Sequence, residues 1–127
     1  MTGIEFEKFM AKVLADQGHW VLTIPRNEAG AQPFDILAIR GREILAVDCK
    51  VCEADTFPTS RIEPNQWTAF KTVWERVSAF RLGLFVLHGK SVYFFDYPHL
   101  LCCRAAKSKS VDFETGRIFL KDVTEWM

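Results

Sequence analysis

The sequence predicts one α/β domain over residues 1–127, with a central mixed sheet flanked by helices. Hydrophobic residues make up 49% of the chain and aromatic residues 13%, which is typical of a globular domain with its own core. A helical pattern opens the chain, and a second one separates two predicted β-hairpins. A helix that connects two strands of one sheet normally joins parallel neighbours, so we expect parallel and antiparallel strands together.

An amphipathic helix is predicted over residues 2–17, because apolar side chains recur there at helical spacing. Thr2 followed by Glu5 is typical of a capping box at the start of a helix, and Gly18 suits its end. Glu5 and Glu7 border the apolar stripe on its two sides. Helical geometry alone does not decide which of them could belong to a functional site, although capping already explains Glu5.

A short strand over residues 20–24 is followed by a polar, glycine-containing loop over 25–32. Arg26 is the basic residue of this loop; it could contact a phosphate, and the alternative is a solvated loop charge. The loop leads into a hairpin whose strands, residues 34–40 and 43–50, are rich in Ile, Leu and Val. Glycine at the first position of the two-residue connection predicts a type II′ turn.

That turn sets the register of the hairpin and places Asp35 opposite Asp48. Opposed residues have Cβ atoms about 4.5–5.5 Å apart, where like charges destabilise a sheet. A divalent cation would offset two carboxylates in these apolar strands, since Mg²⁺ takes oxygen ligands and typically uses one or two carboxylates. Alternation along the strand places Lys50 on the same face as Asp48. The alternative is a structural ion cluster, in which the carboxylates share a proton or Lys50 neutralises them.

The rest of the chain predicts two more helices, a second hairpin with a doubly buried first strand, and a short terminal hairpin. The longer helix is expected to bury five apolar residues, Trp67, Phe70, Val73, Trp74 and Val77. In order, these elements are an irregular segment at 51–61, a helix from residue 63 to about residue 81, strands at 82–87 and 91–97, a helix at 98–106, a basic turn at 107–110, and strands at 111–113 and 117–120.

Charge and cysteine content narrow the functional classes. A net charge of zero, from 16 basic and 16 acidic residues, counts against a simple nucleic-acid binder unless some of the acids hold metal. The four cysteines, at positions 49, 52, 102 and 103, lack the spacing of a structural zinc site, and we expect buried free thiols. No apolar run reaches the length of a membrane span and no signal-peptide pattern opens the chain, so a cytoplasmic protein is expected.

Two short motifs joined by the first hairpin, Pro33-Phe34-Asp35 and Asp48-Cys49-Lys50, resemble the signature of the PD-(D/E)xK nuclease superfamily. Three further segments resemble RecU-type Holliday junction resolvases in a short, phage-like form. They are G-x-x-F-E at 3–7, QPFD at 32–35 and F-x-x-SRI-x-x-x-Q at 57–66. Together these segments follow the order of that family over most of residues 3–86.

The resemblance implies a restriction-endonuclease-like αβββαβ core and a Mg²⁺-dependent endonuclease, with Mn²⁺ as a plausible substitute, that leaves 5′-phosphates. The implied substrate is the four-way DNA junction, cut by a homodimer in paired nicks during recombination and repair. The implied catalytic residues are Glu7, Asp35, Asp48, Lys50 and Gln66, and the implied metal ligands are Asp35, Asp48, Glu7 and the main-chain carbonyl of Cys49. Contacts to DNA are expected from Arg26, Arg61, Lys71, Lys107 and Lys109.

Alternatives remain at this point. Arg61 could pair with Glu63 or another surface acid, and Lys107 and Lys109 could belong to a solvated turn. The same site could serve a broader nuclease for phage or mobile-element DNA. From a different class, the chain could be a non-catalytic DNA-binding module that kept the nuclease fold, although an unused pair of facing carboxylates would only destabilise it.

Overall fold

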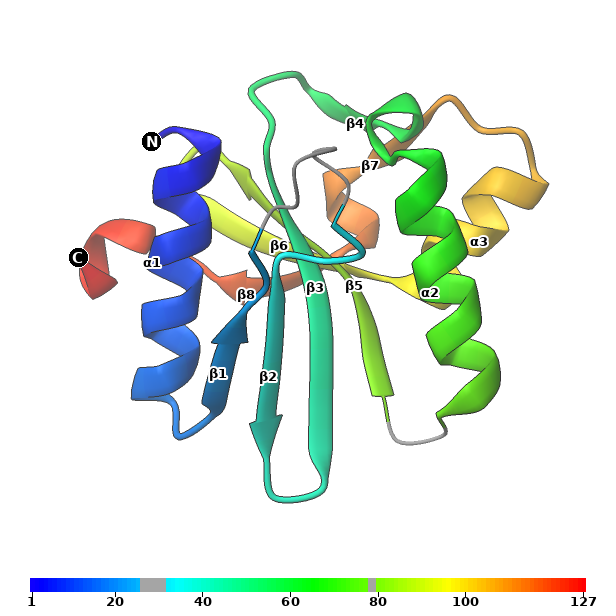
Figure 1. The fold of residues 1–127 in the computed structure, drawn as a ribbon. Helices are drawn as coiled ribbons and strands as arrows, with labels where there is room; N and C mark the ends of the chain where they lie inside the picture. Colours follow the sequence, from blue (N-terminus) through cyan, green and yellow to red (C-terminus); the bar gives the residue numbers. More distant parts are fainter. Residues whose placement is uncertain (26–31, 78–79) are drawn as a thin grey trace.

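The computed structural model describes residues 1–25, 32–77 and 80–127. Its centre is a six-stranded sheet in the order β1-β2-β3-β5-β6-β8, and a separate two-stranded sheet pairs β4 with β7 (Figure 1). The strands are β1 (Trp20–Thr23), β2 (Ile36–Arg40), β3 (Glu43–Val51), β4 (Thr56–Pro58), β5 (Phe80–His88), β6 (Ser91–Asp96), β7 (Ser110–Asp112) and β8 (Arg117–Leu120). The helices are α1 (Gly3–Asp16), α2 (Pro64–Arg76) and α3 (Tyr97–Ala105), with 3₁₀ turns η1 (Thr59–Arg61), η2 (Phe113–Thr115) and η3 (Val123–Trp126).

The sheet is mixed, as predicted. β3 and β5 are parallel neighbours, and every other pairing within the six-stranded sheet is antiparallel. The chain crosses from β3 to β5 through α2, which is the connection that makes a parallel pair possible. β5 lies in the middle, and its residues 82–87 are all buried, which confirms a strand covered on both faces.

Helices cover both faces of this sheet and enclose two cores. α1 packs Phe6, Met10 and Leu14 onto one face, against apolar residues of β2, β3 and β5. α2 and α3 pack Phe70 and Leu100 onto the other face (Figure 1). No helix among the described residues is long and apolar enough to cross a membrane.

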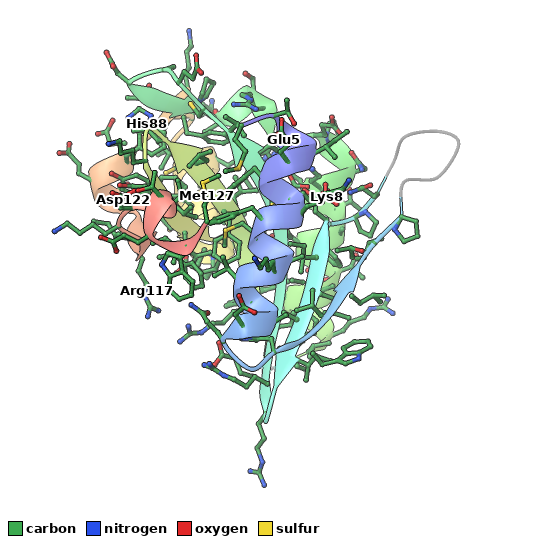
Figure 2. The ribbon with its side chains drawn as sticks, turned by 90° about the vertical axis from the view of Figure 1, so that its left-hand side faces the viewer. Glu5, Lys8, His88, Arg117, Asp122 and Met127 are labelled. Atoms are coloured by element: carbon green, nitrogen blue, oxygen red, sulfur yellow. The ribbon has the colours of Figure 1, made fainter. Side chains whose placement is uncertain are left out.

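The start of α1 follows the predicted capping box. The Thr2 hydroxyl accepts a hydrogen bond from the Glu5 N–H at 3.1 Å, and the Glu5 carboxylate accepts one from the Thr2 N–H at 3.2 Å. Glu5 therefore lies at the exposed amino-terminal end of the helix (Figure 2). These two bonds satisfy main-chain donors that a helix start leaves free.

The first hairpin also has the predicted register. Arg40 pairs with Glu43 and Leu37 with Ala46, so the connection contains two residues. Gly41 has φ +60° while Arg42 does not have positive φ, which is the pattern of a type II′ turn. The paired ladder ends at Ile36 with Val47, and Asp35 lies one residue before the strand.

The predicted end of the long helix is wrong by five residues. α2 stops at Arg76 and Val77 already has an extended backbone, because residues from Phe80 onward pair with β3 from Ile44 to Val51. Ile44 pairs with Phe80, which draws that end of the predicted helix into the sheet. Trp74, expected in the core, is 47% exposed, and its ring lies 5.9 Å from that of Tyr97 on α3.

The predicted terminal hairpin is also wrong. β7 pairs with β4, and β8 pairs with β6 at the edge of the large sheet. The 3₁₀ turn η2 separates them and buries Phe113, which stacks on His88 at 4.0 Å between ring centroids. Long-range pairing of this kind leaves no local signal in a three-residue strand.

The cysteines divide into two pairs. Cys49 and Cys52 are buried, in the cores on opposite faces of the sheet, which agrees with free thiols and not with a shared metal. Cys102 is exposed, so the expectation of a buried thiol is wrong there. It lies on the outer face of α3, next to Leu101, which is 40% exposed.

Candidate metal-dependent nuclease site

A small polar cleft lies at the open end of the first hairpin, beside the start of β2 and the last residues of β3. Its cavity volume is about 150 Å³. Side chains from the segment before β2, from β3 and from the start of α2 meet there, so the cleft lies between the sheet and α2. The cleft is lined by Gln32, Asp35, Asp48, Cys49, Lys50, Glu63 and Gln66.

Asp35 is held in place by four hydrogen bonds. Its N–H donates to the Val47 carbonyl at 2.9 Å, and its own carbonyl accepts from the Ile24 N–H at 2.8 Å. Its carboxylate accepts from the Cys49 N–H at 2.7 Å and from the side-chain amide of Gln32. These bonds continue the hairpin one residue beyond the ladder, so Asp35 reaches the position opposite Asp48 that the register predicted.

Asp48 is buried at 2% exposure and contacts both charged neighbours. Lys50 Nζ lies 3.0 Å from Asp48 Oδ2, which places the two side chains on the same face as predicted. The pKa of Asp48 is raised to about 7, chiefly by burial and then by the neighbouring Asp35 carboxylate, while Lys50 offsets part of this rise. Ionised Asp48 is therefore unfavourable in the metal-free protein.

Two buried oxygens in the cleft have coordination capacity that the described residues leave unused. They are Gln32 Oε1, which has no donor in the described part of the chain, and Asp48 Oδ2, which has no donor there besides the Lys50 ammonium at 3.0 Å. Buried acceptors without partners are uncommon and usually have an explanation such as an ion. A hard divalent cation would coordinate such oxygens, and two carboxylates with neutral oxygen donors suit Mg²⁺ or Mn²⁺. The residues present therefore fit a divalent cation.

The third carboxylate of the predicted ligand set lies near this cleft but not on its wall. Glu7 is half-buried on α1, and its charge raises the pKa of the Cys49 thiol, although burial of that thiol is the larger cause. Within the described ranges, no three His, Cys, Asp or Glu side chains gather closely enough to form a metal cluster. The exposed, capping Glu5 is the poorer candidate, so the structure favours Glu7 over Glu5.

Gln66 and Arg61 have structural contacts that the sequence did not predict. Gln66 is 4% exposed, and its side-chain carbonyl accepts a hydrogen bond from the Glu63 N–H at 3.0 Å, which caps α2. Arg61 donates to the Val51 carbonyl at 2.6 Å, and its guanidinium lies 5.5 Å from the centre of the Phe57 ring. Among the described residues no carboxylate lies within 4 Å of Arg61, so the predicted alternative of pairing with Glu63 is wrong.

The other basic residues expected to contact DNA lie outside the cleft. Lys107 and Lys109 are exposed in the connection from α3 to β7. The Lys109 carbonyl accepts from the Thr59 N–H at 3.0 Å, which holds this turn against η1 and therefore beside Arg61. Lys71 is exposed on α2, and Arg26 lies outside the described residues.

Two residues on the wall of the cleft were not assigned to it from the sequence. Gln32 was noted only as part of the motif QPFD, and its spacing of three residues before Asp35 is the signal that could have indicated contact. Glu63 was predicted as a helix start and as a possible partner of Arg61. Its position on the cleft wall depends on how α2 crosses the sheet, which no local pattern reveals.

Comparison with known proteins gives a consistent picture. The family model described as archaeal Holliday junction resolvase (hjc) matches residues 1–125. The solved structure of Archaeoglobus fulgidus Hjc, described as a Holliday junction resolvase from an archaeal hyperthermophile, is similar with a TM-score of 0.67. That alignment covers 91% of this chain and 95% of the other at 19% identity, so it supports the fold. No curated protein sequence matches the chain.

Proposed function

This chain belongs to the archaeal Holliday junction resolvase family, and from that premise we propose that Asp35, Asp48 and Lys50 form its catalytic centre. The protein is a metal-dependent nuclease that resolves Holliday junctions in DNA recombination. The observation that supports this centre most strongly is the contact between two buried carboxylates beside a lysine, in a cleft that also contains the unpartnered Gln32 Oε1. The alternative of a non-catalytic module is therefore not retained.

The cleft supports a division of roles among its residues. Asp35 and Asp48 would hold the cation, with Gln32 Oε1, the Cys49 carbonyl and Glu7 as further oxygen donors. A bound divalent cation supplies a more acidic water and a Lewis acid for the phosphoryl oxygen. Lys50 would donate to a phosphate oxygen or orient the attacking water, because its ammonium faces the cleft beside Asp48.

Mg²⁺ is the proposed cation, and Mn²⁺ is the proposed substitute. Every donor that the cleft wall offers near the aspartates is an oxygen, apart from the lysine and amide nitrogens. The Cys49 thiol is buried in the core below α1, and its raised pKa disfavours the thiolate that a softer metal would need. The donor set is therefore that of a hard cation.

The proposed path of the DNA backbone runs over η1 and the turn before β7. Arg61, Lys107 and Lys109 lie together there, and α2 begins at the cleft directly after η1. Lys71 extends this surface along α2, and Arg26 belongs to the loop that leads into Asp35. Gln66 would act on the metal water or phosphate through its amide group, since its carbonyl already caps the helix.

We further propose a homodimer in the cytoplasm that makes paired nicks with 5′-phosphate products. The described residues of one chain form one cleft of this kind, and symmetric incision of a four-way junction needs two. The segment 57–66 supports a closer likeness to RecU-type resolvases, because its SRI residues and Gln66 surround the start of α2 beside the cleft. A broader DNA substrate range is the remaining alternative.

The experiment that tests this function compares DNA substrates. A labelled synthetic four-way junction, a linear duplex and a flap of equal length are incubated with Mg²⁺, Mn²⁺ or EDTA. Symmetric nicks in the junction alone, with 5′-phosphate ends and only when a divalent cation is present, are the expected result. Equal cutting of duplex and flap would contradict junction specificity and favour the broader nuclease. Cutting in EDTA would contradict the metal centre.

A further inference from the structure

A second charged cavity lies at the other end of the sheet. Its volume is about 280 Å³, and it lies on the α1 face, between the end of α1 and the first residues of β3, β5 and β8. Glu43 on its rim and Asp48 in the cleft are five residues apart on β3, which corresponds to about 17 Å along an extended strand. Neither the nuclease cleft nor its residues contribute to this cavity.

The lining carries a net positive charge. Arg40, Arg81 and Arg117 face a single carboxylate, that of Glu43, so the fixed charges sum to +2. Glu43 lies 3.7 Å from Arg40 and 3.9 Å from Arg81, and both contacts are long and largely exposed. In the described part of the chain no carboxylate lies within 4 Å of Arg117. Figure 2 shows Arg117 on the same side of the molecule as α1.

A buried histidine in the wall of this cavity lacks a partner. His19 is 8% exposed, and its Nδ1 lies 3.0 Å from the Leu14 carbonyl, which assigns the proton of that nitrogen to this hydrogen bond. Its other ring nitrogen, Nε2, is buried without a hydrogen-bond partner among the described residues. With the proton on Nδ1, Nε2 is an acceptor in the neutral ring and becomes a donor to an anion when the ring is protonated.

The floor of the cavity is aromatic. The Phe85 ring lies 5.5 Å from that of Phe94 and 4.6 Å from that of Phe119, measured between centroids. Phe94 and Phe119 remain partly exposed toward the cavity they line. A neighbouring hollow of about 350 Å³ shares Arg81, Phe94 and Arg117 with it and is lined in addition by Asp96.

We propose that this cavity binds a nucleotide through its terminal phosphate monoester, with the base against the exposed phenylalanine rings. A phosphate monoester carries a charge of about −1.5 to −2 at neutral pH, which matches the charge of the lining. Guanidinium groups bind phosphate oxygens in pairs of parallel hydrogen bonds, and the free donors of Arg81 and Arg117 are available for this. The ligand could be a free mononucleotide or the 5′-phosphorylated end of a DNA strand.

The direct test is calorimetric titration of the full chain with deoxyadenosine 5′-monophosphate in EDTA, which keeps the nuclease cleft free of metal. We expect saturable binding of one nucleotide per chain, with weaker binding of deoxyadenosine and of inorganic phosphate. The Arg117→Gln variant should bind the nucleotide about tenfold to a hundredfold more weakly, because it removes charge-assisted hydrogen bonds. Arg76→Gln makes the same change on α2, away from the cavity, and should bind like the parent.

Two further measurements make the result specific. The imidazole ¹⁵N signals of His19 should shift on addition of the nucleotide in the parent and not in Arg117→Gln. Displacement of the nucleotide by a 5′-phosphorylated oligonucleotide, and not by its 5′-hydroxyl form, would identify a DNA end as the ligand; displacement by neither would identify a free nucleotide.

The proposal is overturned if no saturable binding occurs, if deoxyadenosine or inorganic phosphate binds as tightly, or if Arg117→Gln and Arg76→Gln behave alike. Junction cleavage is measured beside these titrations. Arg117→Gln should cut junctions at the rate of the parent, so a failure of the nucleotide site and a failure of the proposed nuclease centre give different results.

Discussion

Replacing Asp48 with asparagine is expected to stabilise the metal-free protein while removing its nuclease activity. The pKa of Asp48 is raised from 3.8 to about 7, chiefly by burial and then by Asp35. Ionising this group in the folded state is therefore unfavourable by about 4 kcal/mol, since one pKa unit corresponds to about 1.4 kcal/mol. About 4 kcal/mol is therefore the upper end of the expected effect.

The direction in which the free energy of unfolding changes with pH follows from proton binding to Asp48. Between pH 3.8 and about 7, the folded parent holds more protons on Asp48 than the unfolded chain does. Its free energy of unfolding therefore falls as pH rises through this window and levels off above it. Asparagine has no proton to lose, so the Asp48→Asn variant should not show this part of the fall.

Urea denaturation of both proteins in EDTA measures the difference. We expect the variant to be more stable by about 2 kcal/mol at pH 5 and by about 4 kcal/mol at pH 8. Mg²⁺ at a hundred times its dissociation constant should add about 2.7 kcal/mol to the parent and much less to the variant. Asp112→Asn, which neutralises an exposed carboxylate on β7, serves as the control and should change neither quantity. A variant less stable than the parent at pH 8, or an equal difference at both pH values, would refute the reasoning.

Three further predictions concern single side chains. Lys50→Gln should lower the rate of single-turnover junction cleavage by about 10²–10³-fold, because it removes a charge that faces the cleft. A gel-shift assay should show that DNA binding is retained. Cleavage at the rate of the parent would exclude a role for Lys50. Gly83→Ala should lower the free energy of unfolding, measured by urea denaturation, by at least about 3 kcal/mol, because the added Cβ would lie 2.1 Å from a main-chain oxygen of β6. Gly3→Ala is the control, since a Cβ added there meets nothing within 4 Å. Trp67→Ala should cost about 3–5 kcal/mol and Trp74→Ala much less, since the two side chains are 9% and 47% exposed. Similar losses in urea denaturation would contradict this difference in burial.

The features of the fold that depend on residues close together in the sequence were predicted correctly. The capping box at Thr2 and the type II′ turn at Gly41 depend on neighbouring residues, and both are confirmed. The register that follows from the turn correctly places Asp35 opposite Asp48, one residue beyond the paired ladder. Alternation along β3 correctly places Lys50 on the same face as Asp48, with which it forms an ion pair.

The errors have a common physical origin in pairing between distant segments. β5 begins at Phe80 because the long strand β3 offers partners from Ile44 onward, and this pairing overrides the helical pattern around residue 80. β7 is only three residues long and pairs with β4, more than fifty residues earlier in the chain. No window of neighbouring residues contains that information.

In the candidate site too, residues carried by one hairpin were predicted, whereas those placed by packing between distant segments were not. Asp35, Asp48 and Lys50 were predicted together because one hairpin carries them all. Gln66 was predicted on the first turn of α2, but its buried position and its bond to the Glu63 N–H depend on how that helix packs. Gln32 and Glu63 complete the cleft wall through tertiary contacts, and residue type alone does not distinguish them from surface polar residues.

The most direct test of the nuclease centre is junction cleavage by the parent and by Asp48→Asn over a series of Mg²⁺ concentrations, with junction binding measured in parallel. The parent should make symmetric nicks that increase with Mg²⁺ and disappear in EDTA. Asp48→Asn should bind the junction with similar affinity and cut it at no Mg²⁺ concentration, because the cation loses one of its two buried carboxylates. If Asp48→Asn cuts the junction as fast as the parent, the proposed centre is wrong.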